Sequence, residues 1–220
     1  MKINYDREML KILEEEDRKV LAGERKDPAR LLLHSCCAPC SSSVLEQLAA
    51  HFCVAVLYYN PNIYPREEYE FRKAEQQDFI RRFPFPNPVD FLDCEYEPAE
   101  FYRAIKGLEE EPERGSRCTV CYRLRLARTA EEAAKGGYDY FATTLTLSPL
   151  KDPERLNRIG EEEMERVRVL TPDQPGPRWL PSDFKKRNGY LRSIRITAEY
   201  GMYRQDYCGC EYSLRSRKEH

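Results

Sequence analysis

The chain has 220 residues, which is enough for one substantial α/β domain with a hydrophobic core. Its 36 basic and 38 acidic residues give a formal charge of −2, which excludes a uniformly basic nucleic-acid binder but is compatible with local basic patches. The sequence contains no run of 18 apolar residues and no apolar signal-peptide segment at its N-terminus. We therefore expect a cytoplasmic protein that does not span a membrane.

Residues 1–29 predict an amphipathic helix followed by a charged connector. We expect this segment to pack as an appendage on one domain formed by residues 30–220. The helix has an apolar face made of Tyr5, Met9, Ile12, Leu13 and Val20. The apolar run "RLLLHS" (30–35) predicts a buried parallel strand, and the serines at 41–43 predict the N-cap of the next helix. The predicted domain thus opens with a strand, a cysteine-containing loop and a helix.

The alternation of strand and helix continues along the chain. Strands are predicted at 52–59, 88–93 and 138–146, and helices at 66–83, 98–108 and 118–137. Residues 171–190 are rich in loop formers, residues 191–201 predict a helix, and the tail beyond them has no clear pattern. This alternation predicts an α/β fold with a Rossmann-like, doubly wound parallel sheet and helices on both faces.

In such a sheet, ligands bind beyond the carboxyl ends of the strands, near the point where the strand order reverses. The loop after the first predicted strand reads Cys36-Cys37-Ala38-Pro39-Cys40. It lacks the glycines with which nucleotide-binding members of these folds surround a phosphate. We therefore expect thiolate chemistry, rather than phosphate binding, in this loop.

Seven of the nine cysteines fall into three groups, called here the cysteine stations: Cys36, Cys37 and Cys40; Cys118 and Cys121; Cys208 and Cys210. A C-x-x-C pair at the start of a helix directs both thiols the same way, and Gly209 permits the tight backbone of a C-G-C pair. Clustered cysteines in a cytoplasmic protein indicate metal or redox chemistry. Cys53 and Cys94 are expected to be small buried apolar residues.

The number of candidate ligands narrows the choice of metal. Thiolates select zinc, Cu(I) or iron–sulfur clusters, and one zinc ion or one cubane cluster uses four ligands. Seven cysteines exceed either requirement. Four on a [4Fe–4S] cluster would leave three for a second metal nearby.

Four separated segments, which span about residues 30 to 213, read "LLLHSCCAPCSS", "YYNPNIYPREEYEFRK", "CTVCYRLRLARTAEEAAKGGYDYFATTLTLSP" and "YRQDYCGCEYS". Together they resemble the QueH-type epoxyqueuosine reductases, the cobalamin-independent family that completes queuosine in tRNA. The resemblance implies a Rossmann-like fold, a [4Fe–4S] cluster with an adjacent iron or other metal, and reduction of the epoxide on the modified base at the tRNA wobble position. It also implies that the family's cysteine pairs are Cys36 and Cys37, Cys118 and Cys121, and Cys208 and Cys210.

The resemblance gives Cys40 a separate role. In some relatives an aspartate stands at this position and ligates the extra iron, so the resemblance implies that Cys40 takes that role here. Removing an epoxide oxygen as water takes two electrons, whereas a cluster passes one at a time. We expect the second metal to hold the oxygen between transfers and His34 or Asp206 to deliver a proton, although His34 is equally well explained as a buried core histidine.

The expected partners are a tRNA anticodon loop and an external electron donor such as ferredoxin or flavodoxin, because the sequence has no flavin or NAD fingerprint. An extruded nucleotide would stack on aromatic rings and be held at its phosphates by arginine. The candidate substrate contacts are Tyr59, Asn60, Asn62, Tyr64, Arg117, Arg123, Thr144, Ser148, Lys151, Tyr203 and Arg204. Each is also explained as a solvated charge, a turn residue or a helix cap.

Two other functions are compatible with the same cysteines. One is a structural-zinc protein that binds or thiolates tRNA, although the missing Gly-rich loop argues against a version that uses ATP. The other is a metal-free dithiol oxidoreductase that exchanges disulfides through C-x-x-C. Anaerobic purification would distinguish the three, as a brown iron protein, a colourless zinc protein or a metal-free protein with titratable thiols.

Overall fold

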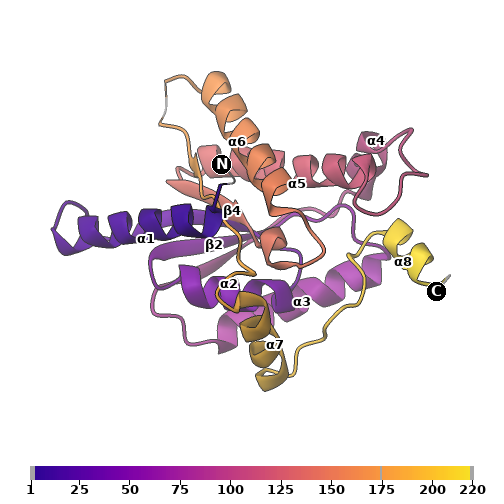
Figure 1. Cartoon of the computed structure of the whole chain (residues 1–220), viewed down its shortest axis with the longest axis horizontal. Coiled ribbons are helices and arrows are strands. Elements are labelled where there is room, and N and C mark those ends of the chain that lie inside the picture. Colours follow the sequence, from indigo (N-terminus) through magenta and orange to yellow (C-terminus); the bar gives the residue numbers. More distant parts are fainter. Residues whose placement is uncertain (1–2, 174, 219–220) are drawn as a thin grey trace.

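The computed structural model describes residues 3–173 and 175–218. It contains an all-parallel five-stranded sheet surrounded by helices, which confirms the predicted α/β class (Figure 1). The strand order is β3-β2-β1-β4-β5. The strands are β1 (Ala29–His34), β2 (Phe52–Tyr58), β3 (Val89–Asp93), β4 (Tyr140–Thr143) and β5 (Arg178–Trp179). The chain runs outward in one direction from β1 to β3 and in the other from β4 to β5, so the strand order reverses between β1 and β4.

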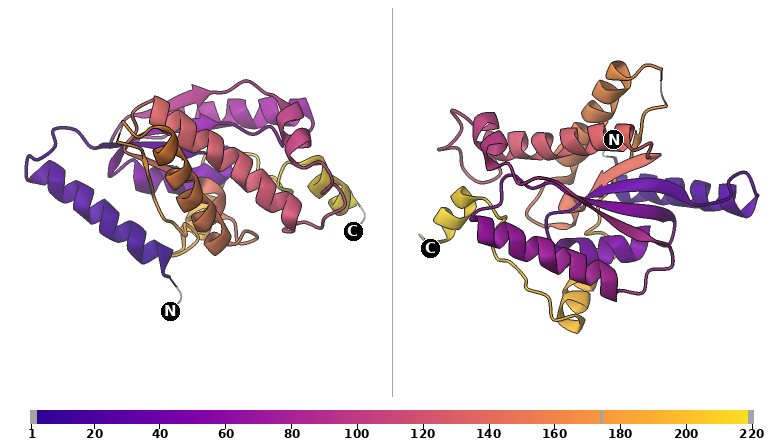
Figure 2. Two further views of the ribbon diagram at one scale, coloured as in Figure 1. Left: turned by 90° about the horizontal axis from the view of Figure 1, so that it is seen from above. Right: turned by 180° about the vertical axis from the view of Figure 1, so that it is seen from behind.

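The helices form a layer on each face of the sheet. In chain order they are α1 (Tyr5–Leu21), α2 (Ala38–Leu48), α3 (Arg66–Arg82), α4 (Pro98–Ala104), α5 (Ser116–Lys135), the 3₁₀ helix η1 (Thr144–Leu147), α6 (Pro153–Leu170), α7 (Gly189–Glu199) and α8 (Glu211–Lys218). Helices α5 and α6 cover one face, whereas α2, α3 and α7 cover the other (Figures 1 and 2). Within the described residues, no helix is both long and apolar enough to cross a lipid bilayer.

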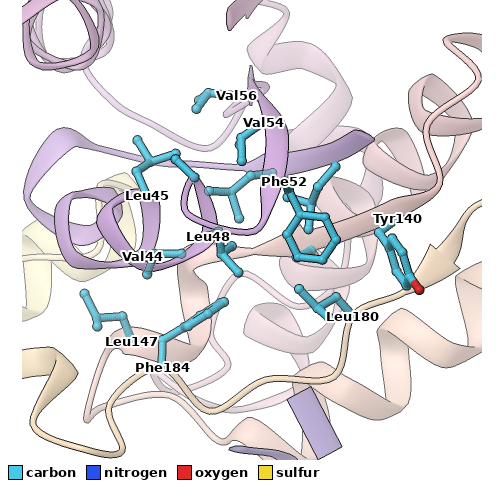
Figure 3. Packing of buried hydrophobic residues seen from close by; sticks show 14 of the residues in the cluster. Val44, Leu45, Leu48, Phe52, Val54, Val56, Tyr140, Leu147, Leu180 and Phe184 are labelled. Carbon is cyan, nitrogen blue, oxygen red and sulfur yellow. The ribbon is translucent and has the colours of Figure 1, made fainter. Parts of the chain in front are cut away.

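Alternating side chains of the central strands supply both cores. In β1, Leu31 and Leu33 belong to the cluster under α2, whereas Leu32 belongs to the cluster under α5 and α6. Figure 3 shows the first cluster, in which apolar side chains of α2 pack on those of β2. Met9 and Leu13 of α1 are fully or almost fully buried in it. The N-terminal helix therefore contributes to the same core as the sheet.

Helix α2 begins earlier than the sequence pattern predicts. It starts at Ala38 rather than at the serines, and Pro39 occupies its first turn, where a missing backbone N–H costs nothing. Ser41 and Ser42 do not cap the helix. Their hydroxyls donate to the carbonyls of Ala38 and Pro39 at 3.1 and 3.0 Å. As a result Cys40 lies in the first turn of a helix and not in the preceding loop.

Gly160 of α6 allows that helix to approach the edge of the sheet. A Cβ at this position would meet the ring of Trp179 at 2.3 Å, and Trp179 is held by a 3.1 Å hydrogen bond from Nε1 to Asn157 Oδ1. We expect Gly160→Ala to lower the free energy of unfolding by about 1–3 kcal/mol through overpacking. Thermal unfolding measures the change, at roughly 2–4 °C per kcal/mol for a chain of this size. Gly176→Ala is the control, because its added Cβ meets nothing closer than 3.8 Å; equal melting temperatures for the two variants would contradict the packing argument.

Candidate metal centre

A cavity of about 630 Å³ lies at the carboxyl ends of β1 and β4, where the strand order reverses. Its wall combines the loop after β1, the first turns of α5, the loop between η1 and α6, and the segment that leads into α8. All seven cysteines of the three stations line this cavity. Segments up to 174 residues apart in the sequence, from position 36 to position 210, thus present thiols to one space.

The first station has its three thiols close together. The Sγ atoms of Cys36, Cys37 and Cys40 all lie within 4.8 Å of one another, and those of Cys36 and Cys37 are 4.0 Å apart. Cys37 immediately precedes α2 in extended conformation, and Cys40 follows within the first helical turn, so the helix start brings the three together. Hydrogen bonding with the Cys37 and Cys40 thiols holds the pKa of Cys36 well below its usual range. This station can therefore hold a metal ion.

The second station lies at the start of α5. Cys118 and Cys121 are three residues apart on this helix and share one face, both almost fully buried. The backbone N–H of Arg114 donates to Cys118 Sγ at 3.2 Å. Burial raises the pKa of Cys121 to about 11. A metal bound in the cavity would instead lower the pKa of Cys121, because a thiol that coordinates a metal is deprotonated.

The third station depends on Gly209. The Sγ atoms of Cys208 and Cys210 are 3.5 Å apart, and the hydrogen bond from Cys210 lowers the pKa of Cys208 to about 5. The φ angle of Gly209 is 109°, and a Cβ there would lie 3.0 Å from Arg72 Nη1. Only glycine fits this turn without displacing the buried arginine. The backbone N–H of Ser213 donates to Cys210 Sγ at 3.4 Å.

The donor set fits metal coordination. A metal–sulfur bond of about 2.3 Å places two thiolates on one tetrahedral ion about 3.8 Å apart, and the separations of 4.0 and 3.5 Å within the first and third stations bracket that value. Backbone N–H groups donate to a sulfur of the second and of the third station, as they do to the thiolates of iron–sulfur sites. All nine cysteines are free thiols. Cys53 and Cys94 do not belong to the cavity wall in the described structure.

Three cations face the thiols from different elements. Arg72 of α3 is 1% exposed and pairs with Glu68, at 2.6 Å from Nη2 to Oε1. Arg125 of α5 is 3% exposed, and its Nε donates to the carbonyl oxygen of Cys121 at 3.1 Å. Neither Arg125 nor Lys151 forms a salt bridge within residues 3–173 and 175–218. Such cations favour thiolate over thiol, so the cavity is built to hold negative charge.

The structure places some of the predicted site residues in the cavity wall and others outside it. Besides the seven cysteines, the wall contains Asp206, Arg117, Ser148, Lys151 and Arg204. Outside the wall lie His34, Tyr59, Asn60, Asn62, Tyr64, Arg123, Thr144 and Tyr203. Arg123 points to acidic residues of α6, with a 2.9 Å ion pair from Nη1 to Glu163 Oε1.

The predicted substrate loop at residues 60–65 makes contacts with two of the cysteine loops. Asn60 Nδ2 donates to the carbonyl of Ser35 at 2.8 Å, next to the first station. The backbone N–H of Tyr64 donates to the carbonyl of Gly209 at 2.8 Å, in the middle of the third station. The loop therefore connects the backbone beside the first station with the backbone of the third station through hydrogen bonds.

His34 is fully buried at the end of β1. Its Nδ1 lies 2.9 Å from Thr143 Oγ1, and its Nε2 lies 3.3 Å from the carbonyl oxygen of Tyr59. Because a carbonyl only accepts, Nε2 carries the proton and Nδ1 accepts from the threonine hydroxyl. Burial lowers the pKa of His34 to about 3, so the ring is neutral near pH 7. The imidazole links β1, β2 and β4 just behind the cysteine loop.

Several residues of the wall were not predicted from the sequence. Arg125 follows Cys118 by seven residues and Cys121 by four, so helical periodicity alone places it on the cysteine face. Tyr122 lies beside it and is 6% exposed. No sequence signal distinguishes Arg72 from the other arginines of α3, because its burial depends on the approach of Gly209 from the distant C-terminal segment.

Comparison with known proteins gives one consistent result. The sequence pattern of the family described as epoxyqueuosine reductase QueH matches residues 31–216. A Streptococcus pyogenes protein named epoxyqueuosine reductase QueH is 44% identical over 216 residues, which cover 97% of this chain and 79% of the relative. Proteins of the same name from Staphylococcus epidermidis and Haemophilus influenzae are 42% and 39% identical, covering 96% and 84% of this chain and 85% and 72% of their own lengths.

Proposed function

This chain belongs to the epoxyqueuosine reductase QueH family, and we propose that it reduces the epoxide of epoxyqueuosine at the tRNA wobble position to give queuosine. It is an oxidoreductase of tRNA modification. In the reaction, the epoxide takes up two electrons and two protons, both carbon–oxygen bonds break, a carbon–carbon double bond forms, and the oxygen leaves as water. The observation that supports this function most strongly is the presence of all seven cysteines of the stations in one cavity at the reversal point of the sheet.

We assign a [4Fe–4S] cluster and an adjacent iron to this cavity. Four of the seven cysteines would hold the cluster and three the second metal, and the close thiols of Cys36, Cys37 and Cys40 fit the binding of an ion. When bound, these groups would supply single electrons and a Lewis acid. An external donor such as ferredoxin or flavodoxin would provide the electrons.

The cavity wall can bind and orient the modified nucleoside. A volume of about 630 Å³ suits a small-molecule site. Tyr122, Tyr190 and Tyr207 offer aromatic rings for stacking. Arg125 and Lys151 supply positive charge inside the wall, where negative charge develops on the departing oxygen.

We propose Asp206 as the proton relay, because its carboxylate can take a proton from water and pass it on. It lines the cavity, its side chain is 51% exposed, and it pairs with Arg217, so it connects the site to solvent. His34 is less suited, because it is neutral and both of its ring nitrogens already have protein partners. In this mechanism Asp206 relays protons from water to the oxygen that leaves.

The direct test is turnover by anaerobically prepared, metal-loaded protein. It would be incubated with epoxyqueuosine-containing tRNA and a low-potential reductant, and the nucleosides would be identified by mass spectrometry. The expected product is queuosine, which has lost one oxygen atom. Unchanged epoxyqueuosine in the presence of an intact cluster would overturn the proposed substrate. The relatives' names do not favour the structural-zinc or dithiol alternatives.

We expect Cys40→Asp to keep substantial activity and Cys40→Ala to lose most of it. A carboxylate remains a ligand for iron, whereas a methyl group does not. In Cys40→Ala we expect acid-labile sulfide to stay constant and iron to fall from about five to about four per chain, because only the adjacent metal is lost. Metal analysis and single-turnover assays of the two variants check this. Loss of sulfide from Cys40→Ala would show instead that Cys40 holds the cluster.

A further inference from the structure

A second, smaller cavity of about 280 Å³ adjoins the first. Five of its lining residues, among them Tyr122 and Lys151, also line the main cavity, and Asp152 and Arg155 complete it. We call it the side cavity. Because five residues line both, the two cavities are immediate neighbours.

The side cavity is positively charged. Arg114, Lys151 and Arg155 line it, and the single acid, Asp152, accepts a hydrogen bond from the backbone N–H of Glu154 at 2.9 Å as the N-cap of α6. None of the three cations forms a salt bridge within the described part of the chain. By contrast, Arg123, Arg158 and Arg166 of the neighbouring helices α5 and α6 pair with glutamates.

Arg155 is held in place for anion binding. Its Nη1 donates to the carbonyl of Arg114 at 2.7 Å and to Thr119 Oγ1 at 3.1 Å. Its Nη2 and Nε have no hydrogen-bond partner among the described residues. A guanidinium fixed on one side and free on the other presents a fork that matches two oxygens of a phosphate.

Arg114 links the side cavity to the metal-binding side of the main cavity. Its φ angle of 73° is in the left-handed region, which is uncommon for a residue other than glycine. In this conformation its N–H donates to Cys118 Sγ at 3.2 Å, while its carbonyl accepts from Arg155. The turn that supports the second cysteine station is thus the turn that positions the fork.

We propose that the side cavity binds a backbone phosphodiester of the RNA substrate, next to the nucleotide whose base enters the main cavity. This inference rests on the proposed function. Three cations without a carboxylate partner match the charge of a phosphodiester, and the exposed side chain of Leu150 (56%) offers an apolar surface for the adjoining ribose. The main cavity recognises the modified base, and the side cavity fixes its position along the strand.

Arg155→Ala tests the inference in the metal-loaded enzyme with an epoxyqueuosine-containing anticodon stem-loop. We expect KM to rise about tenfold and kcat to change by less than about twofold, because the phosphate contact is the same before and during the reaction. The slope of log KM against log salt should become shallower by about 0.7–0.9, as for the loss of one phosphate contact. The KM of Arg155→Lys should lie between those of Arg155→Ala and the wild-type enzyme. Arg195→Ala is the control, since Arg195 is an exposed arginine that lines neither cavity.

A stem-loop with one neutral methylphosphonate at either linkage flanking the modified nucleotide makes the test specific. At one of the two linkages, the methylphosphonate should raise the KM of the wild-type enzyme about tenfold. The same substitution should raise the KM of Arg155→Ala only slightly, because that variant already lacks the contact. Equal losses in the two proteins, or an unchanged KM for Arg155→Ala, would overturn the side-cavity inference and leave the proposed function standing. Wild-type enzyme that carries its metals yet neither binds nor reduces the unmodified-backbone stem-loop would overturn both.

Discussion

Cys208→Ser protein is expected to lose its brown colour, most of its iron and sulfide, and at least about three orders of magnitude in turnover. Cys208 shares its cavity with the other two stations and lies 3.5 Å from Cys210, sulfur to sulfur. Serine oxygen is a harder donor than thiolate and binds iron–sulfur clusters poorly. Absorbance near 400 nm, iron and sulfide analysis, and single-turnover assays under anaerobic conditions measure the three losses.

Cys53→Ser is the matched control. Cys53 belongs to β2 and is not part of the cavity wall, so we expect unchanged metal content and turnover. Circular dichroism of both variants checks that the chain still folds. A Cys208→Ser protein that keeps wild-type iron, sulfide and turnover would remove the third station from the metal centre. Loss of the cluster from Cys53→Ser would show that thiol substitution acts through stability rather than ligation.

Arg125→Met should reduce kcat about a hundredfold without loss of the metals. Arg125 is 3% exposed, lines the cavity together with the thiols, and has no carboxylate partner in the structure as described. Burial disfavours its charge, but the neighbouring Cys121 and Cys36 raise its pKa, so the charge is retained. An interaction of about 1.5–3 kcal/mol with a charged group corresponds to about 65–130 mV for a one-electron couple. The midpoint potential of the variant should be more negative by that amount, because a cation favours the reduced, more negative cluster.

Two further variants separate charge from packing at Arg125. Arg123→Met removes a neighbouring arginine of the same helix that pairs with Glu162 and Glu163 instead of facing the cavity. It should leave the potential and kcat close to wild type. Arg125→Lys keeps the positive charge, so its midpoint potential should lie closer to the wild-type value than that of Arg125→Met. If Arg125→Met and Arg123→Met have equal potentials, Arg125 does not act on the metal centre electrostatically.

The centre of the sheet could be predicted from the sequence because β1 and β2 are almost entirely buried on both faces. The run at 30–35 and the strand at 52–59 read as continuous apolar segments between helical patterns, and the structure places strands within one residue of those starts. The loop after the first strand could therefore be assigned to the ligand-binding edge. That topology accounts for the first station, whereas the third lies in the C-terminal tail, which has no clear sequence pattern, so only the resemblance implied that it joins the others.

The orientation of single side chains could not be predicted in the same way. The "NPNIYP" segment has the composition of a turn in either case, and only the packed structure shows Asn60 contacting Ser35 rather than lining the cavity. Arg123 and Arg125 lie two residues apart in the same basic segment. Arg123 nevertheless pairs with glutamates of α6, whereas Arg125 faces the thiols. The predicted start of α2 was wrong. Three serines suggest an N-cap, but Pro39 already favours a helix that begins about one turn earlier.

The most direct test is the metal and thiol content of anaerobically purified protein. We expect about five irons and four sulfides per chain. Alkylation of the folded protein should label Cys53 and Cys94 first, and the seven cysteines that line the cavity only after the metals are removed. A colourless chain that holds one zinc ion, or one whose nine thiols all react at the same rate, would contradict the central claim that these seven thiols form a single metal centre.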